Sequence, residues 1–188
     1  MLKSSTSLLL ALSFSFLPNL VLGSDNDTAP VQNVTLSPYG TIRRVVTGLD
    51  YDGNSTVLED KRLTAYKNVT IAQTSLFWTD SIPYDARGEG SFVDLVGQHP
   101  EDVESPNGTH FFALDFGPGT SYKFHQTPSI DFGVITHGNM TLILDGDVKV
   151  YLGPGDVLID RGVVHAWANE GLEWVRMFFT LTPALIVS

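Results

Sequence analysis

Two histidines and one aspartate in the second half of this chain have types and spacing that could do chemistry: His125, Asp131 and His165. Alternate residues of a β-strand share a face, so His125, Thr127 and Asp131 can point the same way if the chain between them is extended. His165 follows Gly162 on a later predicted strand. Strands that are distant in sequence bring side chains together inside a closed sheet. The sequence therefore predicts that two imidazoles and one carboxylate converge.

Two kinds of chemistry are open to such a set. Two imidazoles and a carboxylate suit a divalent iron, manganese or zinc ion that keeps open positions for a substrate or for oxygen. Without a metal, the same groups can act as general acid and base, because a histidine beside a carboxylate can move a proton near neutral pH. The alternative to both is a set of hydrogen-bonded pocket residues that bind no metal.

Three further residues are candidates for the substrate pocket: Thr127, Trp167 and His137. Trp167 lies two positions after His165 and shares its face in a strand, so it offers either an aromatic wall to a substrate or ordinary core packing. His137 follows Asp131 by six positions. It is either a fourth pocket group and proton shuttle or an exposed turn histidine.

Short strands must position these residues, and the pattern predicts strands along most of the chain. β-Branched and aromatic residues occur between turn signals that recur every eight to twelve residues, which is typical of a β-sandwich or small barrel. The predicted strands lie in a hairpin over 41–59, at 68–79 and 109–119, in a hairpin over 141–155, and at 156–162, 165–171 and 172–184. We expect an all-β fold in which Tyr122, Phe124 and Phe132, on faces opposite the polar set, pack between sheets.

A long polar segment interrupts this series at 91–107 and carries Glu101, Asp102 and Glu104 between two prolines. A loop of this length is either a functional lid or a solvated surface excursion. His99 and His110 border it, and either side chain could turn toward the pocket.

Composition narrows the classes of partner. The 188 residues are 43% hydrophobic and include no cysteine, so one core without disulfides is expected. The formal net charge of −10 argues against nucleic acid and anionic membranes as partners, because both require basic patches. A small-molecule substrate is the partner that remains.

The first 23 residues are typical of a secretory signal peptide, with Lys3 before an apolar run and a small residue at Gly23. The run is too short for a spanning helix, so no stable membrane insertion is expected. Residues 24–40 are predicted to be a flexible arm. Six glycosylation sequons support a secreted location, at Asn26, Asn33, Asn54, Asn68, Asn107 and Asn139.

The spacing of glycines and polar residues between 119 and 169 resembles the two motifs of the cupin superfamily. The first motif is matched by Gly119, His125, Thr127, Asp131 and Gly138, and the second by Gly155, Gly162, His165 and Asn169. The resemblance implies a double-stranded β-helix, or jelly-roll barrel, over residues 41–188. It also implies a homodimer that pairs through its sheets, and similarity to the small single-domain cupins of fungal secondary-metabolite pathways.

Three departures from these motifs bear on function. Thr127 stands in place of a second histidine, Asp131 in place of glutamate, and Asp160-Arg161-Gly162 in place of Pro-x-Gly. The usual four-ligand set is therefore reduced to His125, Asp131 and His165. The resemblance implies an oxidoreductase that tailors an organic, polyketide-like metabolite with a divalent metal. Two alternatives are a metal-free dehydratase, isomerase or cyclase that uses the same residues as acid and base, and a non-catalytic glycosylated binding or storage protein.

Overall fold

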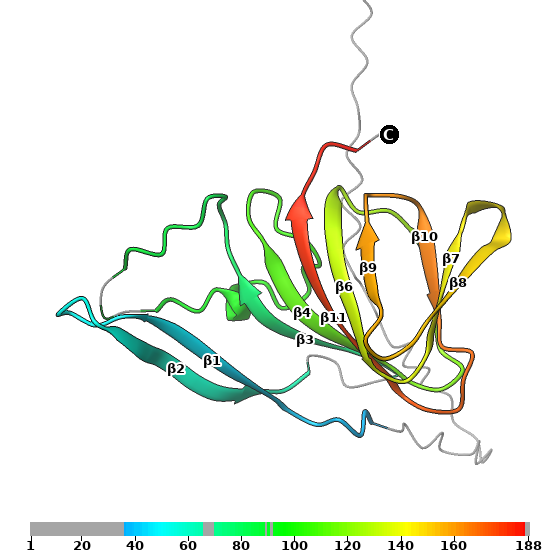
Figure 1. The fold of residues 1–188 in the computed structure, drawn as a ribbon, viewed down its shortest axis with the longest axis horizontal. Coiled ribbons are helices and arrows are strands. Elements are labelled where there is room, and N and C mark those ends of the chain that lie inside the picture. Colours follow the sequence, from blue (N-terminus) through cyan, green and yellow to red (C-terminus); the bar gives the residue numbers. More distant parts are fainter. Residues whose placement is uncertain (1–35, 66–69, 89, 91, 187–188) are drawn as a thin grey trace, which may run out of the picture. The chain divides into compact units, whose positions relative to one another are not determined.

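Strands form nearly all the regular structure of the protein (Figure 1). A computed structural model describes residues 36–65, 70–88, 90 and 92–186. Within these residues the elements are β1 (Ile42–Leu49), β2 (Ser55–Leu63), β3 (Ile71–Trp78), η1 (Val96–Gln98), β4 (His110–Phe116), β5 (Ser121–His125), β6 (Ser129–His137), β7 (Met140–Leu144), η2 (Asp145–Asp147), β8 (Val148–Leu152), β9 (Val157–Asp160), β10 (His165–Ala168) and β11 (Val175–Pro183). The all-β prediction is confirmed.

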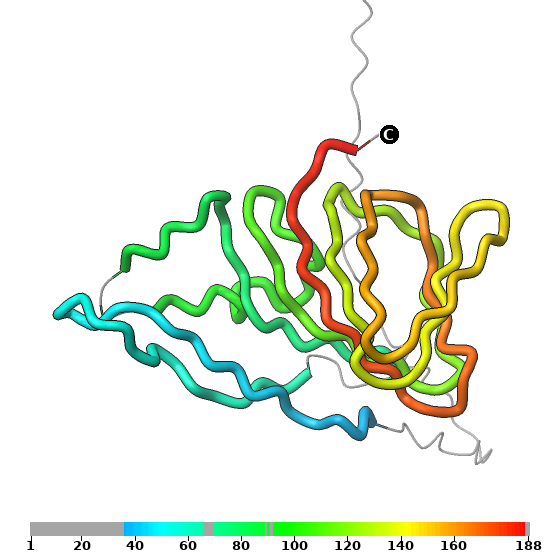
Figure 2. The backbone as a smooth tube through the Cα atoms, in the orientation of Figure 1, coloured from blue at the N-terminus to red at the C-terminus, as the bar shows by residue number. Residues whose placement is uncertain are grey.

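Two antiparallel sheets make the barrel. One has the strand order β3-β4-β11-β6-β9 and the other β5-β10-β7-β8. Figure 2 shows β11, in red, running between β4 and β6. Apart from the consecutive pairs β3–β4 and β7–β8, neighbouring strands are far apart in sequence, which is the connectivity of a double-stranded β-helix.

The hydrophobic core lies between these two sheets. Its buried cluster takes Phe112 from β4, Met177 and Phe179 from β11, and Leu142 and Trp167 from the smaller sheet. On β3 half-buried and buried residues alternate along the whole strand, because successive side chains of a strand face opposite sides. The core thus holds the two sheets together and sets the positions of the inward-facing polar residues.

Both predicted hairpins form. The β1–β2 turn is closed by the Asp50 carboxylate, which accepts hydrogen bonds from the backbone N–H of Asp52 and of Asn54 at 2.9 and 2.8 Å. Gly53 adopts a positive φ of 79° there, which glycine tolerates. Strand β2 runs to Leu63, beyond the predicted end, and β1 and β2 form a separate two-stranded sheet.

The described part of the predicted N-terminal arm, 36–40, is held against the barrel. The Tyr39 hydroxyl donates to the Trp174 carbonyl at 2.6 Å, and the Arg176 guanidinium lies 4.9 Å from the centre of the Tyr39 ring. Arg176 is itself buried and pairs with Asp115 at 2.6 Å. The signal peptide and the arm up to residue 35 lie outside the described residues.

The segment from 92 to 109 is anchored at several points. The Ser105 hydroxyl donates to the Thr79 carbonyl at 2.6 Å and accepts from the Gly108 N–H at 3.1 Å. A Cβ atom on Gly108 would lie 1.8 Å from the Thr79 carbonyl oxygen, so only glycine fits this close approach. Asp94 forms ion pairs with Arg44 and Lys61 of the β1–β2 hairpin, at 2.7 Å each. Much of the segment is therefore fixed to the strands beside it.

No helix among the described residues is long and apolar enough to cross a membrane.

Candidate functional site

A row of buried residues crosses the five-stranded sheet at one level. Direct strand partners place Trp78 beside His110, His110 beside Leu181, Leu181 beside Asp131, and Asp131 beside Asp160. All five are at most 7% exposed. Directly paired residues of neighbouring strands share a face. The row therefore points into the barrel and ends in two carboxylates.

The opposite sheet supplies two histidines. His165 on β10 is the direct partner of His125 on β5, and their ring centroids lie 4.3 Å apart. His165 is buried, whereas His125 is half-buried. The predicted convergence of these two residues thus has a structural basis in the pairing of β5 with β10. We call His125, Asp131, Asp160 and His165 the polar cluster.

Asp160 holds His165 in the polar cluster. The Nδ1 atom of His165 lies 2.9 Å from the Val163 carbonyl oxygen and 3.0 Å from Oδ2 of Asp160. The Val163 carbonyl accepts the hydrogen bond from Nδ1. The contact with Oδ2 of Asp160 is ionic, because this oxygen has no hydrogen-bond partner of good geometry. Burial disfavours the charged ring, but the contact with Asp160 outweighs it and raises the pKa of His165.

His125 is shifted in the opposite direction. Burial lowers the pKa of its ring, and the charge of the neighbouring His165 lowers it further. The Nδ1 atom lies 3.0 Å from the Lys123 carbonyl oxygen, which assigns the neutral ring a proton on Nδ1. The two neighbouring rings, which are tilted by 57° to each other, therefore differ in their preferences: His165 is shifted toward the charged form and His125 toward the neutral form.

Asp131 is a buried carboxyl with hydroxyl partners. The hydroxyl of Ser129 donates to its Oδ1 atom in a short hydrogen bond, and the Thr127 hydroxyl lies 3.5 Å from Oδ2. Burial is the largest influence and raises the pKa of Asp131 to about 6, with a further rise from the charge of Asp160. Ser129 and Thr127 act against this rise.

The expected metal set was tested against this arrangement. Among the residues the structure describes, no group of three or more His, Cys, Asp or Glu side chains is placed to hold a metal ion. The Nδ1 atoms of His165 and His125 face the backbone carbonyls of Val163 and Lys123, so Nε2 is the remaining candidate ligand atom of each ring. His125, Asp131 and His165 do not form such a group as they are placed here, and the metal set stays a prediction.

The other predicted pocket residues lie in different places. Trp167 is 4% exposed, and its ring meets the ring of His165 edge-on at 5.7 Å and that of Phe179 at 5.8 Å. Trp167 thus packs in the core and also contacts the polar cluster through His165. The structure does not bring His137 to the cluster: it is exposed at the far end of β6 from Asp131, where its ring lies 4.7 Å from that of Tyr39.

Of the three aromatic residues expected to pack between the sheets, Tyr122 packs against the core, but the expectation for the two phenylalanines was wrong. Phe124 is 49% exposed and Phe132 is 47% exposed. Their faces are indeed opposite to the polar set, but those faces are the outer faces of the sheets. A strand of a two-sheet barrel has only one face toward the core, and the polar cluster occupies it.

Sequence reasoning missed Asp160 and Ser129. Asp160 was noted only as a departure from a motif, although it lies five residues before His165. Its role depends on the register that places it beside Asp131. Ser129 lies two residues before Asp131, a spacing that could have suggested a hydrogen bond along one strand face.

Three of the predicted glycosylation sites lie in described segments. Asn54, Asn107 and Asn139 are all exposed. The remaining three, Asn26, Asn33 and Asn68, lie outside the described residues. Exposure is what a modified asparagine requires.

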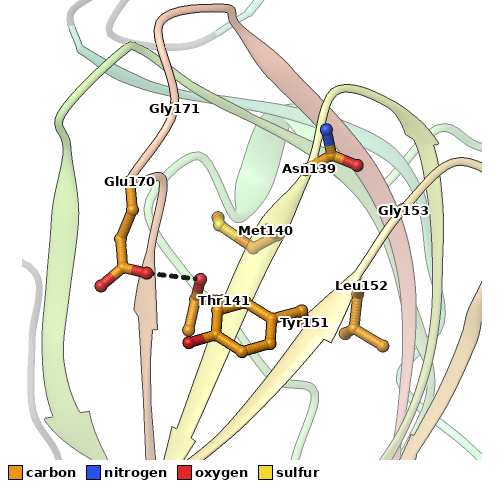
Figure 3. A pocket seen from close by; sticks show the side chains of 8 residues that line it. All are labelled: Asn139, Met140, Thr141, Tyr151, Leu152, Gly153, Glu170 and Gly171. Carbon is orange, nitrogen blue, oxygen red and sulfur yellow. Dashed lines mark hydrogen bonds between the residues drawn. The ribbon is translucent and has the colours of Figure 1, made fainter.

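A surface groove of about 320 Å³ has no residue of the polar cluster in its lining, and Figure 3 shows the side chains that line it. It is lined by Asn139, Met140, Thr141, Tyr151, Leu152, Gly153, Glu170 and Gly171. The Thr141 hydroxyl donates to Glu170 at 3.0 Å, and Lys149 contacts the other oxygen of Glu170 at 2.6 Å. The polar groups of Thr141 and Glu170 are thus already paired, so the groove offers less chemistry than the polar cluster.

The fold and the inward-facing histidines define a small double-stranded β-helix protein, and comparison with known families agrees. The family model for the cupin domain matches residues 112–181. The chain belongs to the cupin family.

Its relatives include fungal proteins. It is 31% identical over 144 residues to the cupin-domain-containing oxidoreductase srdB of Neurospora crassa, covering 73% of this chain and 71% of that protein. It is 32% identical over 136 residues to srdD, a second such oxidoreductase of the same organism, covering 68% and 66%. It is also 36% identical over 109 residues to the phomopsin biosynthesis cluster protein C′ of Diaporthe leptostromiformis, covering 56% and 58%.

Proposed function

We propose that the protein is a small-molecule tailoring enzyme that moves protons on an organic metabolite at the polar cluster. The observation that carries this proposal is the contact between His125 and His165, whose rings lie 4.3 Å apart and whose pKa values are shifted in opposite directions. Adjacent groups with opposed pKa shifts are suited to act as acid and base. The names of the relatives, which refer to biosynthesis clusters and to oxidoreductases, support a role in metabolite tailoring.

The roles follow from the protonation states that the surroundings favour. His125 is the neutral partner and more exposed, so it can accept a proton from a substrate carbon or hydroxyl group. The contact with Asp160 raises the pKa of His165 and favours its charged form, so it can donate a proton to a substrate oxygen. The proton lost by His165 and the one gained by His125 balance, and exchange with water restores the starting state. Dehydration, isomerisation and cyclisation are reactions of this type.

A second candidate is an oxidoreductase. It is favoured by the names of srdB and srdD. A divalent metal held by His125, Asp131 and His165 would require these side chains to rearrange, because they do not form a metal-binding group as placed. Metal analysis of protein purified without chelator, together with activity before and after chelation, separates the two candidates. Activity that is lost on chelation and restored by one metal would favour the oxidoreductase.

Comparison of small molecules in the producing organism with and without this protein is the direct test. We expect one metabolite to accumulate when the protein is absent, and the purified protein to convert it. Identical metabolite profiles would contradict the enzyme proposal and favour a binding or storage protein.

Replacement of His165 by alanine is expected to lower kcat by about 10² to 10⁴-fold, because the variant lacks the proton donor. Turnover of the accumulated metabolite provides the measurement, and a His137→Ala variant serves as the control because His137 lies outside the cluster. Equal losses in the two variants would argue against the assigned role of His165.

A further inference from the structure

The 92–109 segment contributes a carboxyl group to the level of the polar cluster. Glu104 lies between two anchored residues. Val103 packs against the core, and its carbonyl oxygen accepts a hydrogen bond from Nδ1 of His110 at 2.7 Å. Ser105, on the other side, is 3% exposed and donates to Thr79. With both neighbours fixed, the backbone of Glu104 is also fixed.

The position of His110 relates Glu104 to the cluster. His110 belongs to the buried row that continues through Leu181 to Asp131. It is 0% exposed, and Nε2 contacts the Ser75 hydroxyl at 3.1 Å, so both ring nitrogens have partners. His110 thus anchors the segment at the level of the row, and the charge of Asp131 is close enough to raise the pKa of Glu104, after the larger effect of burial.

One oxygen of Glu104 lacks a partner. Its Oε2 atom is buried, and no donor among the described residues reaches it. A buried polar atom without a hydrogen bond costs free energy, and such atoms are rare in native proteins. The backbone anchors explain why the carboxyl stays in place despite this cost, but they do not supply a donor.

We propose that Glu104 is a substrate-contacting residue of the polar cluster, whose buried carboxyl oxygen accepts a hydrogen bond from a hydroxyl or N–H group of the bound metabolite. The inference rests on the proposed function for its substrate class. It assigns the 92–109 segment a fixed contact with the substrate, and it predicts that the metabolite carries a hydrogen-bond donor.

The test combines conversion of the accumulated metabolite with thermal melting of the full chain at pH 7. Glu104→Met removes the unpartnered oxygen and keeps a side chain of similar length. We expect its melting temperature to be equal to or above that of the wild type, while kcat/KM falls by roughly tenfold to a hundredfold. Glu104→Gln keeps an acceptor oxygen and is expected to retain more activity than Glu104→Met. Asp145→Asn, a change of an exposed carboxyl group outside the segment, is the control and should change neither quantity.

Two outcomes would overturn the inference. Unchanged conversion by Glu104→Met would show that Glu104 does not contact the substrate. A melting temperature well below the wild-type value would show that the carboxyl has a structural role. If no metabolite accumulates in the absence of the protein, the proposed function fails separately. The melting temperature of Glu104→Met then decides whether Glu104 is free of stabilising contacts. A lowered melting temperature rejects the inference, and an unchanged or raised one supports it.

Discussion

At the scale of single residues, the two histidines of the polar cluster differ in the groups that contact them. His165 has a carboxylate at 3.0 Å, whereas His125 has a backbone carbonyl at the same distance. An ionised partner favours the charged imidazole far more than a neutral carbonyl does. Burial lowers the pKa of both rings, so the difference in partner explains why only the pKa of His165 is raised.

Replacing Asp160 by asparagine should therefore lower the pKa of His165. Without the negative charge, the effect of burial remains and disfavours the charged ring. Titration of the His165 ring by NMR measures the change, with the exposed Asp145→Asn as control. An unchanged His165 titration would show that Asp160 does not govern its protonation.

Asp131 should make stability depend on pH. Its folded pKa of about 6 lies above the ordinary value of 3.8, so its favourable contribution is present below the unfolded pKa and is lost as pH rises through about 6. Asp131→Asn should stabilise the protein at pH 7 by about 2–3 kcal/mol and much less at pH 4. Denaturant unfolding of both proteins at both pH values measures this, and an equal difference at the two values would contradict it.

At the scale of elements, the 92–109 segment behaves as a wall rather than as a lid. Ser105, Asp94 and the carbonyl of Val103 each hold it to a different neighbour. Motions that open a lid would have to break these contacts together. The segment is therefore expected to stay in place when substrate binds.

Ser105→Ala should lower the free energy of unfolding by about 1–3 kcal/mol, because it leaves the buried Thr79 carbonyl and Gly108 N–H without their partner. Equilibrium unfolding in urea measures the loss. Ser121→Ala, at an exposed position of β5, is the matched control. If the two variants are equally stable, the segment is loosely held and the lid interpretation is favoured again.

At the scale of the whole molecule, the signal-like first 23 residues and the six sequons lead us to propose a secreted glycoprotein. A homodimer also stays a proposal. The exposed sequons Asn54 and Asn139 each fall at the connection between two strands, and Asn107 falls just before β4. Glycans at these positions would extend into solvent without disturbing a strand.

Enzymatic removal of N-linked glycans from the protein made by its own host should lower its mass. Mass spectrometry of peptides that contain Asn54, Asn107 and Asn139 identifies the modified sites, and an Asn54→Gln variant should lose one glycan. An unchanged mass would contradict passage through the secretory route.

Sequence periodicity by itself determined the fold class and most strands of this protein. Strand alternation and turn residues act over a few positions, so they can be interpreted without tertiary contacts. They sufficed for the β1–β2 and β7–β8 hairpins, and the motif spacing placed His125 and His165 on strands of one barrel. They also assigned Phe124 and Phe132 to faces opposite the polar set, but could not decide which face meets the core.

Only the tertiary structure decided which polar side chains meet. The pairing of β6 with β9 places Asp160 beside Asp131, and the anchored segment brings Glu104 to their level. Strand register and loop path depend on contacts between residues far apart in the chain, which local patterns do not encode. For the same reason, His165 could be expected to carry chemistry from its sequence position, whereas the carboxylate that sets its charge could be identified only in the folded barrel.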